Sequence, residues 1–166
     1  MPLLLSLVIA LDSAAADLPA GNCAAPQAAM DLSQCDFSRK KLAGRDLRGA
    51  RLAGAKMEST DFSKANLSGA DLRGSNAKWA NFTGANLSGA DLTGAAMEQV
   101  DFTNAKLKAT RLTGATLRQA IFFKADMEGA DLANADVWNA SFDKALNMAD
   151  SVQEALVEPF VVRDRR

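Results

Sequence analysis

Residues 60–94 read TDFSKANLSGADLRGSNAKWANFTGANLSGADLTG. Every fifth residue of this stretch, from Phe62 to Leu92, is apolar, and a small residue precedes each of them by two positions. A period of five matches neither the two-residue period of a strand nor the 3.6-residue period of an amphipathic helix. The stretch is therefore a short repeat, and short repeats predict a stacked, solenoid-like architecture.

The five-residue period continues without insertion from Leu32 to Phe142, and no proline lies between Gln27 and Glu158. Phenylalanine recurs at every twentieth residue from position 62 to position 142. A coil made of four five-residue sides would stack these rings in one column, whereas a three-sided coil would scatter them. With coils about 4.8 Å apart, as neighbouring strands are, nearly six coils form a column roughly 27 Å long. The central positions that are neither Leu nor Phe are Met57, Ala77, Met97, Met127 and Val137.

The motif A-(D/N)-L-x-G occurs in full as ANLSG at residues 65–69 and as ADLRG at residues 70–74. This motif resembles that of the pentapeptide-repeat proteins, and the resemblance covers about 115 of the 166 residues. It implies an all-β fold, a right-handed quadrilateral β-helix. In that fold the central residue and the small residue two positions before it point inward, and the other three face solvent. Glycine, frequent two positions after the centre, suits a corner.

The amino end predicts export. Leu3–Leu11 is an apolar run, and Ala14 and Ala16 fit a small-x-small cleavage rule. We expect cleavage after Ala16, although Met1-Pro2 gives an atypical n-region without a basic residue. A buried N-terminal helix is the alternative. The expected organisation is a signal peptide at 1–16, an N-terminal segment and cap at 17–30, the repeat β-helix at 31–145, and a C-terminal cap helix and tail at 146–166. The expected location is periplasmic or secreted.

Cys23 and Cys35 are the only cysteines, and both lie where the repeat begins. In an exported chain, an even pair at this place predicts a disulfide, worth on the order of 3 kcal/mol in the chain-entropy picture. In a reducing compartment, Cys35 would instead be a buried thiol and Cys23 a free one. Two cysteines in a chain without histidine are too few for a zinc site.

The carboxyl end departs from the repeat after Phe142. Residues 151–154 (SVQE) have the form of a capping box, and Val152, Ala155 and Leu156 have the spacing of one apolar helix face. Pro159 would end such a helix. We expect a short C-terminal helical cap that covers the open end of the column.

Composition argues against an enzyme. The chain has no histidine, a formal net charge of −1, and no apolar stretch long enough to span a membrane. Asp71 and Asp91 would stack about 5 Å apart, like the paired carboxylates of glycosidases. They would nevertheless lie on a convex face without a pocket, next to arginines of the same column. We therefore predict no catalytic residue, no cofactor, no metal and no nucleic-acid partner.

The outer positions suggest two features. Glu58, Lys78, Glu98 and Arg118 alternate in sign along one column, which ends in Trp138, so we expect a ladder of ion pairs. Several apolar residues stand where the repeat expects polar ones. These could form a partner-binding or homodimer patch near the C-terminal coils, or the C-terminal cap could cover them. The patch residues are Trp79, Trp138, Ile121 and Phe123.

The expected function is that of a non-enzymatic, secreted or periplasmic repeat scaffold that binds another, unknown protein. The stretch from Asn22 to Asp36 is similar to exported bacterial members of the pentapeptide-repeat family. The resemblance also supplies an alternative, because some members of the family mimic duplex DNA and bind DNA gyrase. Mimicry requires a strongly negative column, whereas lysines and arginines interleave with the acidic residues here.

Overall fold

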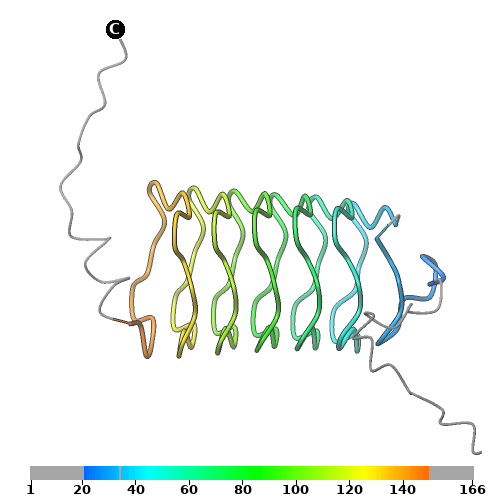
Figure 1. Ribbon diagram of the computed structural model, residues 1–166, viewed down its shortest axis with the longest axis horizontal. Helices are drawn as coiled ribbons and strands as arrows, with labels where there is room; N and C mark the ends of the chain where they lie inside the picture. The colour runs from blue at the N-terminus through cyan, green and yellow to red at the C-terminus, as the bar shows by residue number, and fades with distance from the viewer. Residues whose placement is uncertain (1–20, 34, 150–166) are drawn as a thin grey trace, which may run out of the picture.

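The computed structural model describes residues 21–33 and 35–149, which wind into a column of stacked coils (Figure 1). The described part of the chain contains no helix and no strand longer than one residue; instead, bridge residues recur at every fifth position from Asp31 to Leu146. Every bridge is parallel and joins residues twenty positions apart, from Asp31↔Arg51 to Asp126↔Leu146. The twenty-residue register expected from the phenylalanine spacing is therefore confirmed, and four pentapeptides make one coil.

The backbone of each pentapeptide is bonded to the coils on both sides of it. The central residue donates its N–H to the next coil, as Leu72 does to the carbonyl of Asp91 at 2.7 Å. The residue before the centre donates back to the preceding coil, as Asp91 does to Ala70 at 3.0 Å. The residue three positions after the centre closes a turn, as Ser75 does onto Leu72 at 3.1 Å. These bonds leave few unpaired backbone groups inside the column.

The Asp or Asn before each centre has a structural task. Its side-chain oxygen accepts the N–H of the residue two positions later, as Asp71 does from Arg73 and Asn86 from Ser88, both at 3.1 Å. Asx side chains often replace a backbone acceptor in this way. The expectation that this position merely faces solvent is therefore incomplete, because these residues are mostly half-buried and complete the hydrogen bonding of the turn.

The core consists of the central residues and the small residues two positions before them. The phenylalanines stack face to face from Phe62 to Phe142, with ring centroids 5.0, 5.4, 5.0 and 4.6 Å apart. Each full burial of a Leu or Phe side chain contributes roughly 1.5–3 kcal/mol. Ala77, the smallest central residue, is also completely buried. The core is thus a continuous apolar rod along the axis of the column.

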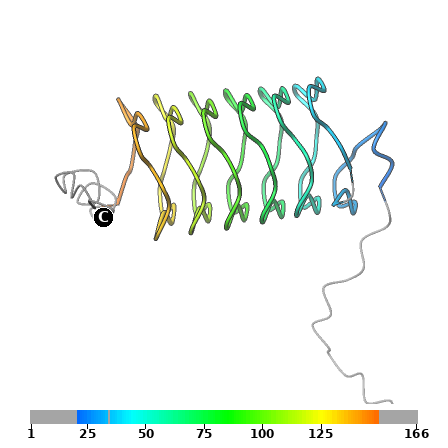
Figure 2. The same ribbon diagram turned by 90° about the horizontal axis from the view of Figure 1, so that it is seen from above.

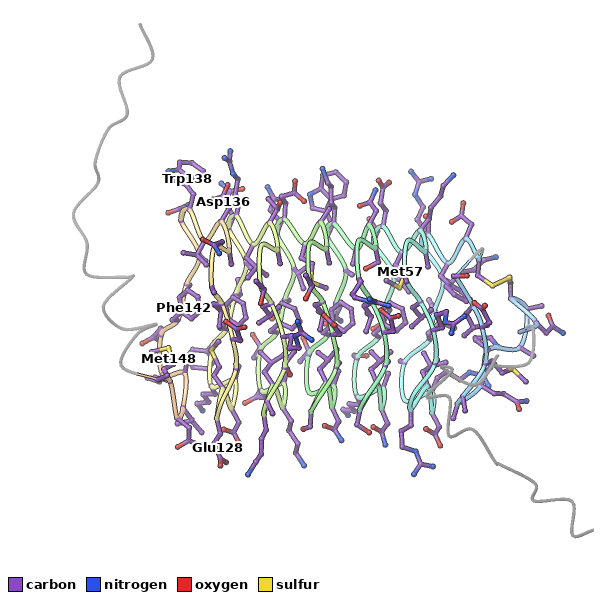
Figure 3. The ribbon with its side chains drawn as sticks, viewed as in Figure 1. Met57, Glu128, Asp136, Trp138, Phe142 and Met148 are labelled. Atoms are coloured by element: carbon purple, nitrogen blue, oxygen red, sulfur yellow. A yellow bond between two sulfur atoms is a disulfide. The ribbon has the colours of Figure 1, made fainter. Side chains whose placement is uncertain are left out.

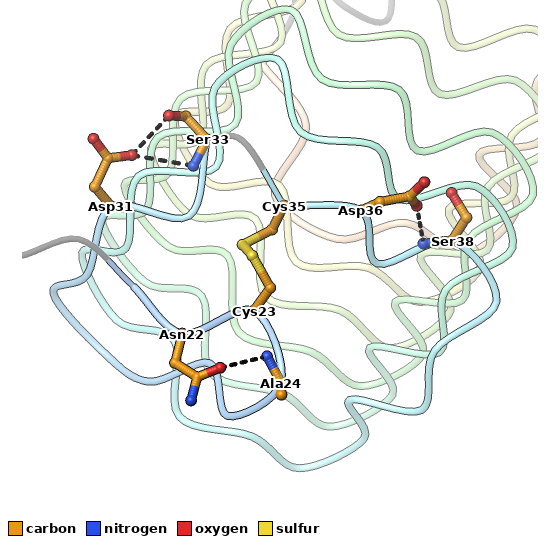
Figure 4. Close-up of a disulfide and its surroundings, with 8 residues drawn as sticks. All are labelled: Asn22, Cys23, Ala24, Asp31, Ser33, Cys35, Asp36 and Ser38. Carbon is orange, nitrogen blue, oxygen red and sulfur yellow. Dashed lines mark hydrogen bonds between the residues drawn. A yellow bond between two sulfur atoms is a disulfide. The ribbon is translucent and has the colours of Figure 1, made fainter.

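The N-terminal end of the column is closed by a short segment. Cys23 and Cys35 form a disulfide with a Cα–Cα distance of 5.4 Å (Figure 4), as the sequence led us to expect. The N–H of Gly21 bonds to the carbonyl of Asp31, and that of Ala29 to Arg48, both at 2.8 Å. These contacts tie the segment to the first coil.

The C-terminal end of the column lies opposite the N-terminal end (Figure 2). Here Leu132, Val137 and Phe142 are only half-buried, although their counterparts in the other coils are fully buried. Residues 146–149 are not helical, and the capping helix expected around Ser151–Leu156 lies outside the described residues, as does the expected signal peptide.

Candidate interaction surface

One corner of the column is built without glycine. At the position two residues after each centre the backbone is left-handed, and three of the four corner columns contain glycine there in several coils, such as Gly54, Gly74, Gly94 and Gly114. The fourth corner has no glycine in any coil. Its residues are Arg39, Ser59, Trp79, Gln99, Gln119 and Asn139, with φ between 54° and 61°.

A left-handed backbone is unfavourable for residues with a side chain, by roughly 1–2 kcal/mol, although Asn tolerates it better than most. Glycine would relieve this strain, and little would be lost in packing because these side chains are exposed. We call these six residues the glycine-free corner. The choice of long side chains at this corner indicates that the side chains themselves are required.

The side chains of the glycine-free corner form a ladder along the column. The indole N–H of Trp79 donates to Oε1 of Gln99 at 3.0 Å, and Nε2 of Gln99 donates to Oε1 of Gln119 at 2.6 Å. Trp79 is nevertheless 53% exposed. The ladder therefore holds a large aromatic side chain in a fixed place at the surface, which reduces the entropy lost when such a residue binds a partner.

Trp138 extends the exposed surface toward the C-terminal end. It lies beside Asn139 of the glycine-free corner, its side chain is 51% exposed, and its backbone N–H donates to Asp136 at 3.2 Å. Figure 3 shows Trp138 projecting from one edge of the column, with Glu128 at the opposite edge and Phe142 in the interior between them. Trp79 and Trp138 thus share an edge, separated by about three coils, or roughly 14 Å.

Ile121 lies on the adjoining side and is 43% exposed. It stands where Asp101, one coil earlier, accepts the N–H of Thr103 at 2.8 Å. An isoleucine cannot accept that bond, and among the described residues the N–H of Phe123 has no hydrogen-bond partner. Ile121 therefore lacks the turn hydrogen bond that Asp provides and also exposes apolar area. It is a second position where the residue type suits the surface better than it suits the repeat.

Phe123 differs from the other three predicted patch residues. Its ring is half-buried, with the ammonium groups of Lys124 and Lys144 at 5.2 and 5.4 Å from the ring centroid. Such cation–π contacts stabilise an aromatic ring at the surface. The four residues do not form one continuous apolar patch, because the polar side chains of Gln99 and Gln119 separate Trp79 from the rest.

The expected ladder of alternating charges is mostly wrong. Only Lys78 and Glu98 pair as expected, at 3.0 Å. Glu58 instead accepts the side-chain amide of Asn76 at 2.6 Å, and Arg118 pairs with Asp136 at 2.5 Å. Both partners lie eighteen positions later in the sequence, at the bridge position just before a centre of the next coil. The prediction from sequence spacing considered only partners in the same column and therefore did not include these pairs.

Asp71 and Asp91 have partners that leave no free acid–base pair. Arg73 binds Asp71 through two nitrogens, at 2.8 and 2.7 Å, and Thr93 bonds to Asp91. The hydrogen bond from Arg73 lowers the pKa of Asp71 despite its partial burial. A general acid needs the opposite shift. Asp71 is therefore held as a carboxylate, chiefly by Arg73 of its own pentapeptide. Asp91 pairs with Arg111 of its column at 3.6 Å, as the sequence led us to expect.

Residues 21–33 and 35–149 lack two other kinds of site. No group of three or more potential metal ligands occurs there. No helix in this part is long and apolar enough to cross a membrane.

The comparisons with known proteins agree with the fold. A family model for pentapeptide repeats matches residues 41–76, 80–119 and 110–146, with eight copies in total. The column of five-residue repeats thus defines a pentapeptide-repeat β-helix. The chain belongs to the pentapeptide-repeat family, whose members are generally non-enzymatic scaffolds. No curated protein matches the chain.

Three solved structures illustrate the similarity. Rfr23 from Cyanothece 51142 is 29% identical over 60% of this chain and 65% of its own, with a TM-score of 0.43. HetL from Nostoc sp. strain PCC 7120, involved in heterocyst differentiation regulation, is 26% identical over 71% of this chain and 68% of its own, with a TM-score of 0.30. A pentapeptide repeat protein of the Arabidopsis thaliana thylakoid lumen is 24% identical over 66% and 75%, with a TM-score of 0.42.

Proposed function

We propose that this protein is an exported, non-enzymatic scaffold that binds another protein along the glycine-free corner. The observation that carries the proposal is the exposure of Trp79 and Trp138, about half of each side chain, on one edge of a mostly polar surface. Tryptophan is the residue most enriched in the energetic centres of protein interfaces. The hydrogen-bonded ladder gives Trp79 a fixed position before any partner arrives.

Export is part of the proposal. The apolar run Leu3–Leu11, the small residues at Ala14 and Ala16, and the Cys23–Cys35 disulfide all suit a secreted or periplasmic protein. The intact mass of the protein recovered from each cell compartment tests this. A periplasmic species that begins at Asp17 and lacks two hydrogens supports export, whereas a cytosolic, reduced, full-length species contradicts it.

We also infer two finer features of the fold. The column has four sides, supported by the twenty-residue register and the five-residue period, and winds in the right-handed sense that the family resemblance implies. Residues 146–166 cap its C-terminal end, supported by the half-buried Phe142 and the exposed Leu146 there. An alternative cover for that end is a second copy of the chain. A crystal structure and the mass of the particle in solution test these features.

The binding surface can be tested by site-specific photocross-linking. A photoreactive amino acid at Gln99 would sit between the two tryptophans, and the same amino acid at Gly69 would sit on a different corner as the matched control. The proposal expects one protein to be labelled from Gln99 and not from Gly69, in extracts of cells that naturally express the gene. Equal labelling from both positions would contradict the proposed surface.

The cross-linked protein is then tested with purified components. Replacing both Trp79 and Trp138 by Ser should weaken its binding at least about thirtyfold, the loss expected if only one of them is a hot spot that contributes about 2 kcal/mol. A double variant at exposed positions of another corner, Lys64→Ser with Lys124→Ser, should bind normally. Purified DNA gyrase should not bind; inhibition of its supercoiling by this protein would favour the DNA-mimic alternative.

A further inference from the structure

The charge of the chain is distributed unevenly along the column. The coil of residues 37–56 contains one acidic residue, Asp46, and seven basic residues, although the whole chain has a formal charge of −1. We call these twenty residues the basic coil, and Figure 1 shows this part of the chain, in blue to cyan, at the N-terminal end of the column. The basic residues are Arg39, Lys40, Lys41, Arg45, Arg48, Arg51 and Lys56.

Two of these cations occupy unusual positions. Lys40 and Arg45 stand two residues before a centre, where Ala50, Ala65 and the corresponding residues of other coils are small and buried. Lys40 and Arg45 are instead exposed. Lys40 and Arg45 can be exposed because the residues that follow them, Lys41 and Asp46, form bridges only toward the next coil, to Asp61 and Asn66. The two side chains therefore stand at an edge that we call the free edge because no bridge pairs it on its N-terminal side, although the N-terminal segment lies next to Arg45.

The same edge offers backbone donors. Among the described residues, the N–H groups of Lys41 and Asp46 have no hydrogen-bond partner, whereas the equivalent N–H of Asp61 bonds to the carbonyl of Lys40 at 3.0 Å. A depression of about 310 Å³ lies beside them, lined by Pro26, Gln27, Ala28, Arg45 and Asp46. Free N–H groups next to cationic side chains suit oxyanions.

Most of the positive charge of the basic coil is not neutralised within the protein. Arg48 pairs with Asp46 at 2.7 Å, and Arg51 with Asp31 at 3.3 Å. Within the described part of the chain the other five cations form no ion pair, although Lys40 and Lys56 lie near the carboxylate of Asp36, and Lys41 near that of Asp61, and add to the hydrogen bonds that lower the pKa values of these groups. Five unpaired cations in one coil, at one end of the column, create a local positive field that the net charge of the chain conceals.

We propose that the basic coil docks this end of the column on an anionic lipid surface. A planar array of phosphate headgroups complements cations that surround the end of a column, and each basic residue near such a surface strengthens binding by about fivefold. Duplex DNA fits less well, because its major groove accepts a single helix or a two-stranded ribbon and not the broad end of a column. The described part of the basic coil also has no exposed aromatic residue to stack on bases.

Protection of the free edge is the simpler explanation of some of these charges. Charged residues at an edge prevent two columns from joining end to end. That explanation accounts for Lys40 and Arg45. It does not account for Lys56, which forms bridges on both sides, to Asp36 and Asn76, and so does not lie at an edge.

The test measures binding of the full chain to lipid vesicles. The readout is the ratio of the partition coefficients for vesicles that contain phosphatidylglycerol and for vesicles of phosphatidylcholine alone. Insertion of the apolar run Leu3–Leu11 would contribute to both coefficients and cancel in the ratio. We expect a ratio well above one that falls toward one at high salt, because electrostatic attraction is screened.

The test variant combines Arg39→Gln, Lys40→Ala and Arg45→Ala. Alanine is the usual residue of the repeat at the latter two positions, and Gln99 and Gln119 already hold the same corner position as Arg39, so the variant should fold. Loss of three charges should lower the ratio by about a hundredfold. The control combines Lys106→Gln, Lys108→Gln and Lys124→Gln, which removes equal charge three or more coils away, beyond the screening length of about 8 Å.

The outcomes separate the explanations. A large fall for the basic-coil variant and a small one for the control supports the proposal. Equal falls in both variants would contradict it, as would tighter binding to duplex DNA than to the anionic vesicles. Unchanged vesicle binding with end-to-end oligomers of the basic-coil variant in light scattering would also contradict it and leave edge protection as the role of these charges.

Discussion

Two columns of side chains run along this protein with the same twenty-residue spacing but in different environments. The phenylalanine column from Phe62 to Phe142 lies inside the coils, where its rings stack on one another and all but the half-buried Phe142 are fully buried. The glycine-free corner from Arg39 to Asn139 lies outside on left-handed backbone, and three of its side chains, Trp79, Gln99 and Gln119, are joined by hydrogen bonds. The inner column is optimised for stability, whereas the outer column retains strain that stability alone would remove.

The largest expected effect comes from breaking the inner column. Phe102→Ala should lower the free energy of unfolding by about 3–5 kcal/mol, because it leaves a cavity between two stacked rings. The change should appear as a lower midpoint in urea unfolding followed by circular dichroism. Gln99→Ala changes an exposed residue of the glycine-free corner and is the matched control. It should lower the free energy of unfolding by less than about 1 kcal/mol. Similar losses in both variants would contradict the division between the columns.

Reduction of the disulfide tests whether the stability of the N-terminal end of the column depends on a covalent link. Cys35 occupies one of the small inward positions, so the bond anchors the N-terminal segment directly to the core. Reduction should destabilise the protein by on the order of 3 kcal/mol in the chain-entropy picture. Thermal melts with and without reductant measure it. A melt that reductant leaves unchanged would show that the segment adds nothing to the stability of the column.

Acid should affect the bridge positions and leave the glycine-free corner intact. Backbone N–H groups of Ser63 and Ala133 lower the pKa of Asp61 and of Asp131, respectively, below the ordinary value of 3.8. A lowered folded-state pKa contributes stability that is present above that ordinary value and is lost as the pH falls through the folded-state pKa. The melting temperature should therefore drop below about pH 4, and the absence of histidine should keep it nearly flat between pH 5 and 8.

The acid effect has a control within the repeat itself. Asn81 accepts the N–H of Thr83 at 2.9 Å, so an amide can replace the carboxylate at this position. The double variant Asp61→Asn with Asp131→Asn should lose less melting temperature in acid than the unmodified protein. Asp143→Asn, at an exposed position outside the bridge column, should behave like the unmodified protein. An acid loss that is the same in all three proteins would assign the transition to other groups.

The smallest effect concerns the outer column and has the opposite sign. Gln119→Gly should leave stability unchanged or raise it by up to about 1 kcal/mol, because relief of the left-handed strain exceeds the entropy cost of glycine. A Cβ atom at Gly94 would meet no neighbouring atom within 4 Å, so the reciprocal change Gly94→Gln should cost about 1 kcal/mol for the left-handed backbone alone. Urea unfolding measures both. A clear loss of stability for Gln119→Gly would show that the ladder is structural.

The sequence predicted the repeat fold well because the period of five places every core residue without reference to any distant contact. The stacking of Phe62 to Phe142 and the twenty-residue register follow from spacing alone. These features depend on position in the repeat, which the sequence displays directly. The Cys23–Cys35 bond was expected on other grounds, an even pair of cysteines at the start of the repeat in a chain predicted to be exported, because the repeat position of Cys35 alone also fitted a buried thiol.

The surface was less predictable because exposed side chains choose between several neighbours. Arg118 could pair with Glu98 in the preceding coil or with Asp136 in the following coil, and the repeat spacing favours neither. The glycine-free corner was missed although its signal is visible in the sequence, since no glycine occurs at positions 39, 59, 79, 99, 119 or 139. The basic coil was missed because the total charge was considered instead of the charge of each coil.

The constant register also makes the protein a ruler. Because every bridge joins residues twenty positions apart, duplication of any complete inner coil would lengthen the column by about 4.8 Å and leave each side chain on its own side. Insertion of a single pentapeptide would instead move every later residue to the next side. Duplication of residues 97–116 would therefore increase the separation of Trp79 and Trp138 by one coil spacing. The basic coil, the disulfide and both ends of the column would be unaltered.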